Sequence, residues 1–171
     1  MAEPDAPDAL HDRAARAATQ WRTEWPDIDT FPMEVLGRLT EVAQIVTRDR
    51  LNPLFAAFGL QNGEFDVLAT LRRSGEDYAL TPTALYEAAM ISSGGMTARI
   101  DRLEKAGLVE RRKHPTDRRG TLVALTDQGK TLIDDVLPVH VENERTILAT
   151  LSEPERRTLN ALLAKLLGGL L

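Results

Sequence analysis

The sequence has 171 residues and 43% hydrophobic content, which suits one compact domain or one subunit of an interlocked dimer. It contains no cysteine, so disulfides, cysteine-ligated zinc and thiol chemistry are excluded. The formal net charge of -5 argues, taken alone, against a nucleic-acid partner, because phosphates repel an acidic surface. The N-terminus lacks the basic and apolar regions of a signal peptide, and no apolar run approaches membrane-spanning length. We therefore expect a cytoplasmic protein with no membrane partner.

The charge is distributed unevenly along the chain. Between residues 92 and 120, eight Lys or Arg stand against four acids, so this segment carries +4 and the rest of the chain -9. A basic island on an acidic body is typical of a face that binds polyanions. A solvated charged face has the same composition, and charge alone does not separate the two interpretations.

Two helices are expected before residue 60. The first covers about residues 11–24 and carries Trp21. The second begins after the cap candidates at 29–30, with Pro32 in its first turn, where a missing N–H costs nothing. Its apolar stripe must be buried against something and consists of Val35, Leu39, Val42 and Val46. We expect Pro53 to kink or end this helix and Gly59 to close the segment.

Three short helices and a hairpin follow in close order. The helices are expected to be capped by Asn62, by Thr81 and by Ser92 or Ser93, and the third should stop at Gly107. Their predicted inward residues are Phe65, Leu68 and Leu71 in the first helix and Met96, Ile100 and Leu103 in the third. Two β-prone runs, 108–113 and 121–125, flank a turn-rich basic loop and predict a two-stranded hairpin.

Two more helices complete the chain. Thr126 is expected to cap a long helix bent at Pro138, and residues 152–155 match a capping box. The last helix has a wide apolar face built from Leu159, Leu162, Leu163, Leu166, Leu167 and Leu170. The C-terminal segment therefore exposes more leucine than a small monomer tolerates, which favours a homodimer.

Helix, turn, helix and basic hairpin in succession predict a mainly α fold with a small β-hairpin wing, the winged helix-turn-helix. Small side chains at the start of the third helix let the helix N-terminus approach a major groove closely. Arginines at the hairpin tip can reach an adjacent minor groove, whose negative potential attracts them. The candidate DNA-binding residues are Ser92, Ser93, Gly94, Thr97, Arg102, His114, Arg118 and Arg119.

Three segments together resemble the MarR (multiple antibiotic resistance regulator) family: residues 93–112 (SGGMTARIDRLEKAGLVERR), 117–120 (DRRG) and 122–129 (LVALTDQG). The resemblance covers about residues 31–170 and implies a transcriptional regulator, most often a repressor, that binds a palindromic operator as an intertwined homodimer. It implies a dimerisation helix at 31–60, a DNA-binding lobe at 61–125 and C-terminal dimerisation helices at 126–171, and residues 1–30 are expected to form an N-terminal extension helix. In the wing, it implies that Asp117 braces an inserted arginine, Arg118 or Arg119.

A narrower resemblance is to the branch of this family that responds to urate or to small carboxylates such as citrate or aconitate. It implies that Trp21, Asp66, Arg99 and Arg111 surround an anionic ligand, with Trp25 as the alternative to Trp21. Asp66 is then expected to hold both arginines by charge pairing until the anion competes with it. Each residue also has an ordinary interpretation: a packing tryptophan, a surface carboxylate, or arginines that contact phosphate.

Other functions find less support. An architectural DNA-binding protein without effector and a protein–protein module on a winged-helix scaffold are the alternatives, and the basic wing argues against the second. The sequence contains no phosphate-binding loop and no catalytic triad in a known order, so we expect neither an enzyme nor a cofactor. His11 and His140 have no second ligand at metal-binding spacing, so we expect no metal site. His140 is expected to be a partly buried, hydrogen-bonded histidine that could line the effector cavity.

Overall fold

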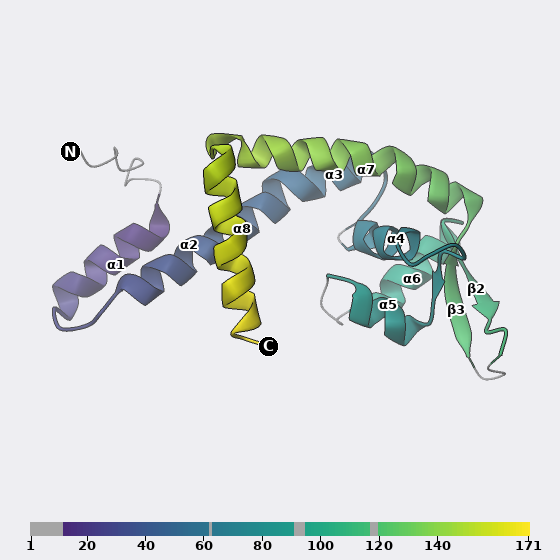
Figure 1. Cartoon of the computed structure of the whole chain (residues 1–171), viewed down its shortest axis with the longest axis horizontal. Coiled ribbons are helices and arrows are strands. Elements are labelled where there is room, and N and C mark those ends of the chain that lie inside the picture. Colours follow the sequence, from purple (N-terminus) through teal and green to yellow (C-terminus); the bar gives the residue numbers. More distant parts are fainter. Residues whose placement is uncertain (1–11, 62, 91–94, 117–119) are drawn as a thin grey trace. The chain divides into compact units, whose positions relative to one another are not determined.

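The computed structural model describes residues 12–61, 63–90, 95–116 and 120–171. It forms two compact units, one ending at Arg50 and the other beginning at Leu51. The expected mainly helical fold with a small β wing is confirmed (Figure 1). Within the described ranges, no helix is both long enough and apolar enough to cross a membrane.

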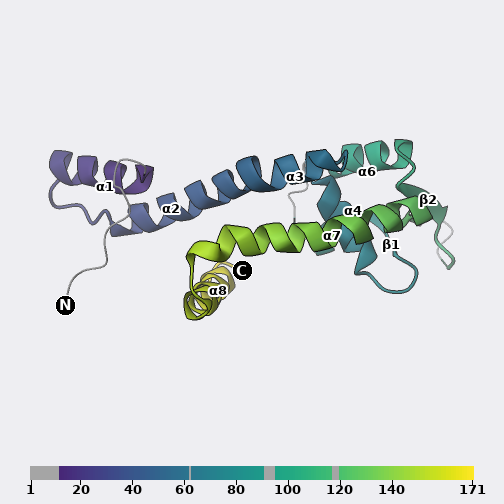
Figure 2. The same ribbon diagram turned by 90° about the horizontal axis from the view of Figure 1, so that it is seen from above.

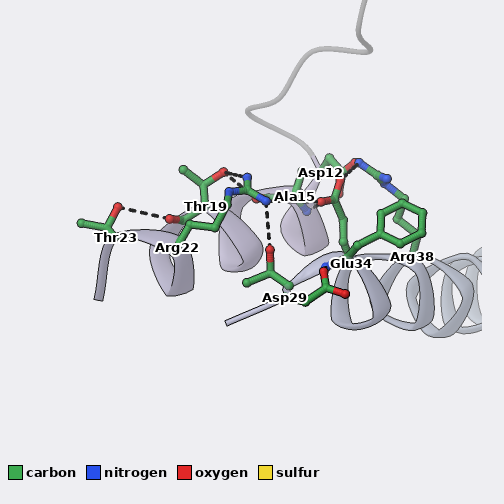
Figure 3. A network of polar contacts seen from close by, with 10 residues as sticks. Asp12, Ala15, Thr19, Arg22, Thr23, Asp29, Glu34 and Arg38 are labelled. Atoms are coloured by element: carbon green, nitrogen blue, oxygen red, sulfur yellow. Dashed lines mark hydrogen bonds and ion pairs between the residues drawn. The ribbon is translucent and has the colours of Figure 1, made fainter. Parts of the chain in front are cut away.

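The first unit is a helical hairpin of α1 (Arg13–Glu24) and α2 (Phe31–Ile45), close to the predicted bounds. The helices are antiparallel, since Arg38 pairs with Asp12 at 2.7 Å while Arg22 donates to Thr30 Oγ1 at 3.0 Å (Figure 3). Asp12 also caps α1 by accepting the N–H of Ala15 at 2.9 Å. The structure thus confirms an N-terminal helix and shows that it packs on α2.

A π-helical segment, η1 (Val46–Leu51), links α2 to α3 (Asn52–Ala57). The predicted irregularity therefore precedes Pro53, which lies in the first turn of α3. Proline has no N–H to donate to the carbonyl four residues back, and its ring crowds that carbonyl, so a wider turn fits here. Gly59 closes the segment with a φ of +75°, as expected.

The second unit contains α4 (Glu64–Arg72), β1 (Ala79–Leu80), α5 (Pro82–Ala88), α6 (Met96–Lys105), β2 (Val109–Lys113) and β3 (Thr121–Leu125). The sheet is antiparallel in the order β1-β3-β2, with Ala79 opposite Ala124 and Arg111 opposite Val123. The hairpin prediction is confirmed, and β1 is an additional short strand. Thr81 caps α5 as expected, accepting the N–H of Ala84 at 3.2 Å.

Two predicted helix starts are wrong. Gly63, with a φ of +77°, occupies the N-cap of α4, and Gly95, with a φ of +85°, occupies that of α6. The third helix therefore begins at Met96 and not at Ser92, because a left-handed residue interrupts helical geometry. Asn62, Ser92 and Ser93 lie outside the described residues.

The C-terminal helices are α7 (Asp127–Ile147) and α8 (Glu153–Gly168), joined by the 3-10 turn η2 (Leu148–Thr150). Thr126 caps α7 by accepting the N–H of Gly129 at 3.0 Å, and α7 continues through Pro138. A Cβ at position 129 would lie 1.9 Å from the carbonyl oxygen of Leu108, so only glycine fits. The capping box of α8 is confirmed by the Ser152 N–H, which donates to Glu155 at 2.7 Å.

The core of the second unit lies between α4, α6, the sheet and the first half of α7, and both views show α4 beside α7 (Figures 1 and 2). All six predicted inward residues of α4 and α6 are buried. Leu85 of α5 and Val123 of β3 are also fully buried. One continuous core therefore holds α4, α5, α6 and the sheet as a single lobe.

Candidate nucleic-acid interface

Helix α6 presents a buried face and a polar face. Met96, Ile100 and Leu103 anchor it in the core, while Thr97 is exposed in its first turn. The side chain of Thr97 is small, and at a helix N-terminus unpaired N–H groups and the helix dipole favour a phosphate or a base edge. Gly94, Ser92 and Ser93, the other candidates at this end, lie outside the described residues.

Arg102, predicted to contact DNA, pairs with an acid of another helix of the lobe. Its Nε lies 2.8 Å from Oε1 of Glu64, the first residue of α4. The Glu64 side chain is only 6% exposed and also accepts the N–H of Gln61 at 2.6 Å. Sequence reasoning missed Glu64, because an acid in the first turn of a helix is ordinarily a solvated residue that complements the helix dipole.

The two arginines of wing strand β2 are paired with acids. Arg111 binds Glu104 and, at 2.5 Å, Asp101, and Arg112 lies 2.5 Å from Glu110. The hydrogen bond to Asp101, with the nearby Glu104 charge, raises the pKa of Arg111. The basic island is thus partly neutralised by its own acids.

The base of the wing loop is held by His114. Its N–H donates to the carbonyl of Gly120 at 3.0 Å, and the N–H of Thr116 donates to its Nδ1 at 3.3 Å. This arrangement closes the hairpin beyond the last strand pair. Asp117, Arg118 and Arg119, at the predicted tip, lie outside the described residues.

Asp66 of α4 is half-buried beside several cations. Burial raises the pKa of its carboxyl, and the charges of His140, Arg73 and Arg99 oppose that shift. Arg99 lies against the start of α4, since a Cβ at Gly63 would be 2.5 Å from its Nε. The expectation that Asp66 also holds Arg111 is wrong, because Arg111 is bound by Asp101 and Glu104 of α6.

His140 lies on α7 against two aromatic rings. Its centroid is 4.5 Å from that of Phe65 and 5.4 Å from that of Phe55, and Nε2 is 3.2 Å from Glu144. The side chain is mostly buried, as expected, but Nδ1 has no hydrogen-bond partner among the described residues. The prediction of a hydrogen-bonded histidine is therefore only half met.

The four predicted effector residues are divided between the two units. Trp21 lies within α1 and is 45% exposed, whereas Trp25 follows the helix and is 60% exposed. Asp66, Arg99 and Arg111 belong to the second unit. Among the residues that the structure describes, no group of three or more His, Asp or Glu is placed to hold a metal ion.

Comparison with known proteins identifies the family. Residues 58–120 match the MarR family model. The HTH-type transcriptional regulator PecS of Dickeya dadantii is 46% identical over 146 residues, which cover 85% of this chain and 87% of PecS. The chain belongs to the MarR family. Two solved structures are similar to it in fold and in sequence.

A mutant of MarR from Escherichia coli, solved in complex with operator DNA, has a TM-score of 0.68 and 28% identity over 86% of this chain and 97% of its own. BpsR of Bordetella bronchiseptica, described as regulated in its DNA binding by 6-hydroxynicotinic acid, has a TM-score of 0.64 and 26% identity over 78% of this chain and 98% of its own.

Membership of the MarR family confirms the winged helix-turn-helix and the predicted class of function. The protein is a DNA-binding transcriptional regulator and not an enzyme. Helix α6 and the β2–β3 hairpin are accordingly its recognition helix and wing. The alternative of a protein–protein module on a winged-helix scaffold is therefore no longer supported.

Proposed function

We propose that this MarR-family regulator is a homodimeric repressor that binds a pseudo-palindromic operator and releases it when a small organic anion binds. One observation carries the proposal. Arg99, whose charge acts on the half-buried Asp66, belongs to the recognition helix itself. An anion that engages Arg99 would therefore act directly on the element that reads DNA.

The proposed DNA contacts come from the start of α6 and from the wing. The start of α6 enters the major groove with Thr97 and the preceding Ser92, Ser93 and Gly94. The wing reaches the minor groove with His114 and an arginine, Arg118 or Arg119, braced by Asp117. Two recognition helices related by a two-fold axis then require half-sites about one helical turn apart.

Dimerisation is proposed from the apolar surface of α2 and α8. In a single chain, Leu36 and Val42 of α2 are 54% and 58% exposed, and Leu162 of α8 is 60% exposed. Apolar faces of this extent mark an interface, and a second copy of the chain covers them symmetrically. Residues 31–60 and 126–171 are the proposed dimerisation segments, with residues 1–30 as an extension and 61–125 as the DNA-binding lobe.

The proposed effector is a small anion such as urate or a citrate- or aconitate-like acid, bound near Trp21, Asp66, Arg99 and Arg111. It would compete with Asp66 for Arg99, and with Asp101 and Glu104 for Arg111, by charge-assisted hydrogen bonds. Because Asp101 and Glu104 also lie on α6, both competitions act on the recognition helix. The ligand must favour the released conformation by a few kcal/mol to change occupancy appreciably. We place this regulation in the cytoplasm, where the operator lies.

The test is a mobility shift on the DNA upstream of the protein's own gene, with urate, citrate and aconitate added singly. We expect at least one anion to release the wild-type protein, and Arg99→Ala to need about tenfold more anion, the loss of one charged contact. Asp66→Ala should need less anion than wild type, because the carboxylate that competes for Arg99 is gone. Glu153→Gln, an exposed change on α8, is the control and should respond as wild type. The effector site is wrong if no anion releases DNA or if both variants respond to the anions as wild type does.

A further inference from the structure

Two arginines of the recognition helix, three residues apart, are directed at the start of α4. Arg99 lies against the backbone of Gly63, and Arg102 donates to Glu64. Gly63 has a φ of +77°, and any side chain there would meet Arg99. The N-terminus of α4 is therefore shaped to receive the arginine face of α6.

Glu64 is the buried member of this contact. Its side chain is 6% exposed, whereas that of Arg102 is 41% exposed. A buried carboxylate is tolerated only when it is paired and hydrogen-bonded. Arg102 Nε at 2.8 Å and the N–H of Gln61 at 2.6 Å supply those partners, and the dipole of α4 adds to them.

The contact between Arg102 and Glu64 restricts rotation of α6 about its own axis, which core packing alone permits. Met96, Ile100 and Leu103 bury one face of α6, but apolar packing is not directional and permits small rotations about the helix axis. A polar pair from the side of α6 to a fixed point on α4 is directional. The pair therefore sets the rotation of α6 and the direction in which its exposed residues point.

We propose that Glu64 is a positioning residue for DNA recognition, and that Arg102 acts by anchoring α6 to Glu64 rather than by neutralising a phosphate. The proposal rests on the operator binding proposed above. It reassigns Arg102 from the predicted contact residues to the support of the helix. It also makes a buried acid, which cannot itself contact DNA, necessary for operator affinity.

The experiment compares wild type with Arg102→Ala, Glu64→Gln and Glu64→Gln/Arg102→Ala for binding to the upstream DNA over a range of salt concentrations. We expect each single change to weaken operator binding about tenfold or more, because it removes the directional contact between α6 and α4 and disturbs the buried Glu64 carboxylate. The double variant should be no weaker than the worse single variant, because both remove the same contact. The dependence of log affinity on log salt should keep its slope, since no phosphate contact is lost.

Two results would overturn the proposal. If Arg102→Ala lowers the magnitude of the salt slope by about one per subunit, Arg102 contacts phosphate and the proposal is wrong. Operator affinity of Glu64→Gln equal to wild type also overturns it. If Glu64→Gln does not fold, the salt slope of Arg102→Ala alone decides.

Glu153→Gln, which disrupts the exposed pair with Arg157, is the matched control and should change neither affinity nor slope. Failure of the wild type to bind the upstream DNA would instead contradict the proposed function.

Discussion

At the scale of single residues, the half-buried Asp66 is unusual because its burial disfavours the charged form of its carboxyl. Burial raises the pKa of its carboxyl even though the charges of His140, Arg73 and Arg99 act to lower it. The cost of removing the carboxylate from water therefore exceeds the gain from the three cations. A carboxylate that destabilises the folded state in this way fits a functional position better than a structural one.

Asp66→Asn should therefore stabilise the protein at neutral pH. A folded-state pKa above the unfolded value of 3.8 means that the folded state binds the proton more tightly, so stability falls as pH rises through the folded-state pKa. The variant should have a higher Tm than wild type at pH 7, and the difference should vanish below about pH 4. Thermal unfolding of both proteins across this range measures it. A variant less stable than wild type at pH 7 would show that ion pairing outweighs burial.

At the scale of elements, Arg73 ties two helices of the lobe together. Its Nη2 donates to the carbonyl oxygen of Ala88, the last residue of α5, at 2.7 Å. The final carbonyls of a helix have no partner within the helix, and a cation there also complements the dipole. Because α5 precedes the recognition helix, Arg73 stabilises the first half of the helix-turn-helix from α4.

Arg73→Ala should lower the free energy of unfolding by about 1 kcal/mol, the scale of one exposed charge-assisted hydrogen bond. Urea unfolding measures the change. Arg157→Ala removes an arginine from an exposed ion pair within α8 and should cost less than about 0.5 kcal/mol. Equal losses in the two variants would mean that the bond to Ala88 contributes nothing specific.

The elements also show where sequence reasoning succeeds and where it stops. Periodicity located α4, periodicity with capping located α5, α7 and α8, and β-prone runs located both wing strands, because these signals are local. The two-residue strand β1 is too short for an alternating pattern, and it exists only because β3 pairs with it. The start of α6 was misplaced because serine is the commoner cap, whereas the chain uses Gly95.

For the candidate site, the sequence predicted which residues take part but not which residues they pair with. Thr97 is exposed on α6 and Asp66 is half-buried, consistent with their predicted roles. The pairs of Arg102 with Glu64 and of Arg73 with Ala88 join residues far apart in sequence, and no local pattern encodes them. The family resemblance and opposite charge predict that Asp66 holds Arg111, but Asp101 and Glu104 of the neighbouring helix are its actual partners.

At the scale of the whole molecule, the net charge of -5 conceals the function, because the basic residues are concentrated in residues 92–120. The structure adds that Arg102, Arg111 and Arg112 of this segment are ion-paired. Specific binding must then depend on where a few groups are held, and less on a broad positive field. Two copies of the lobe, held by the apolar faces of α2 and α8, would double those contacts on one operator.

The most direct test is binding to the DNA upstream of the protein's own gene, with a footprint and with sedimentation of the complex at the same salt concentration. We predict two protected half-sites about one helical turn apart, two chains per site, and affinity at least about 10³-fold above that for unrelated DNA. Equal affinity for unrelated DNA of the same length, or a single chain bound at the site, would contradict it.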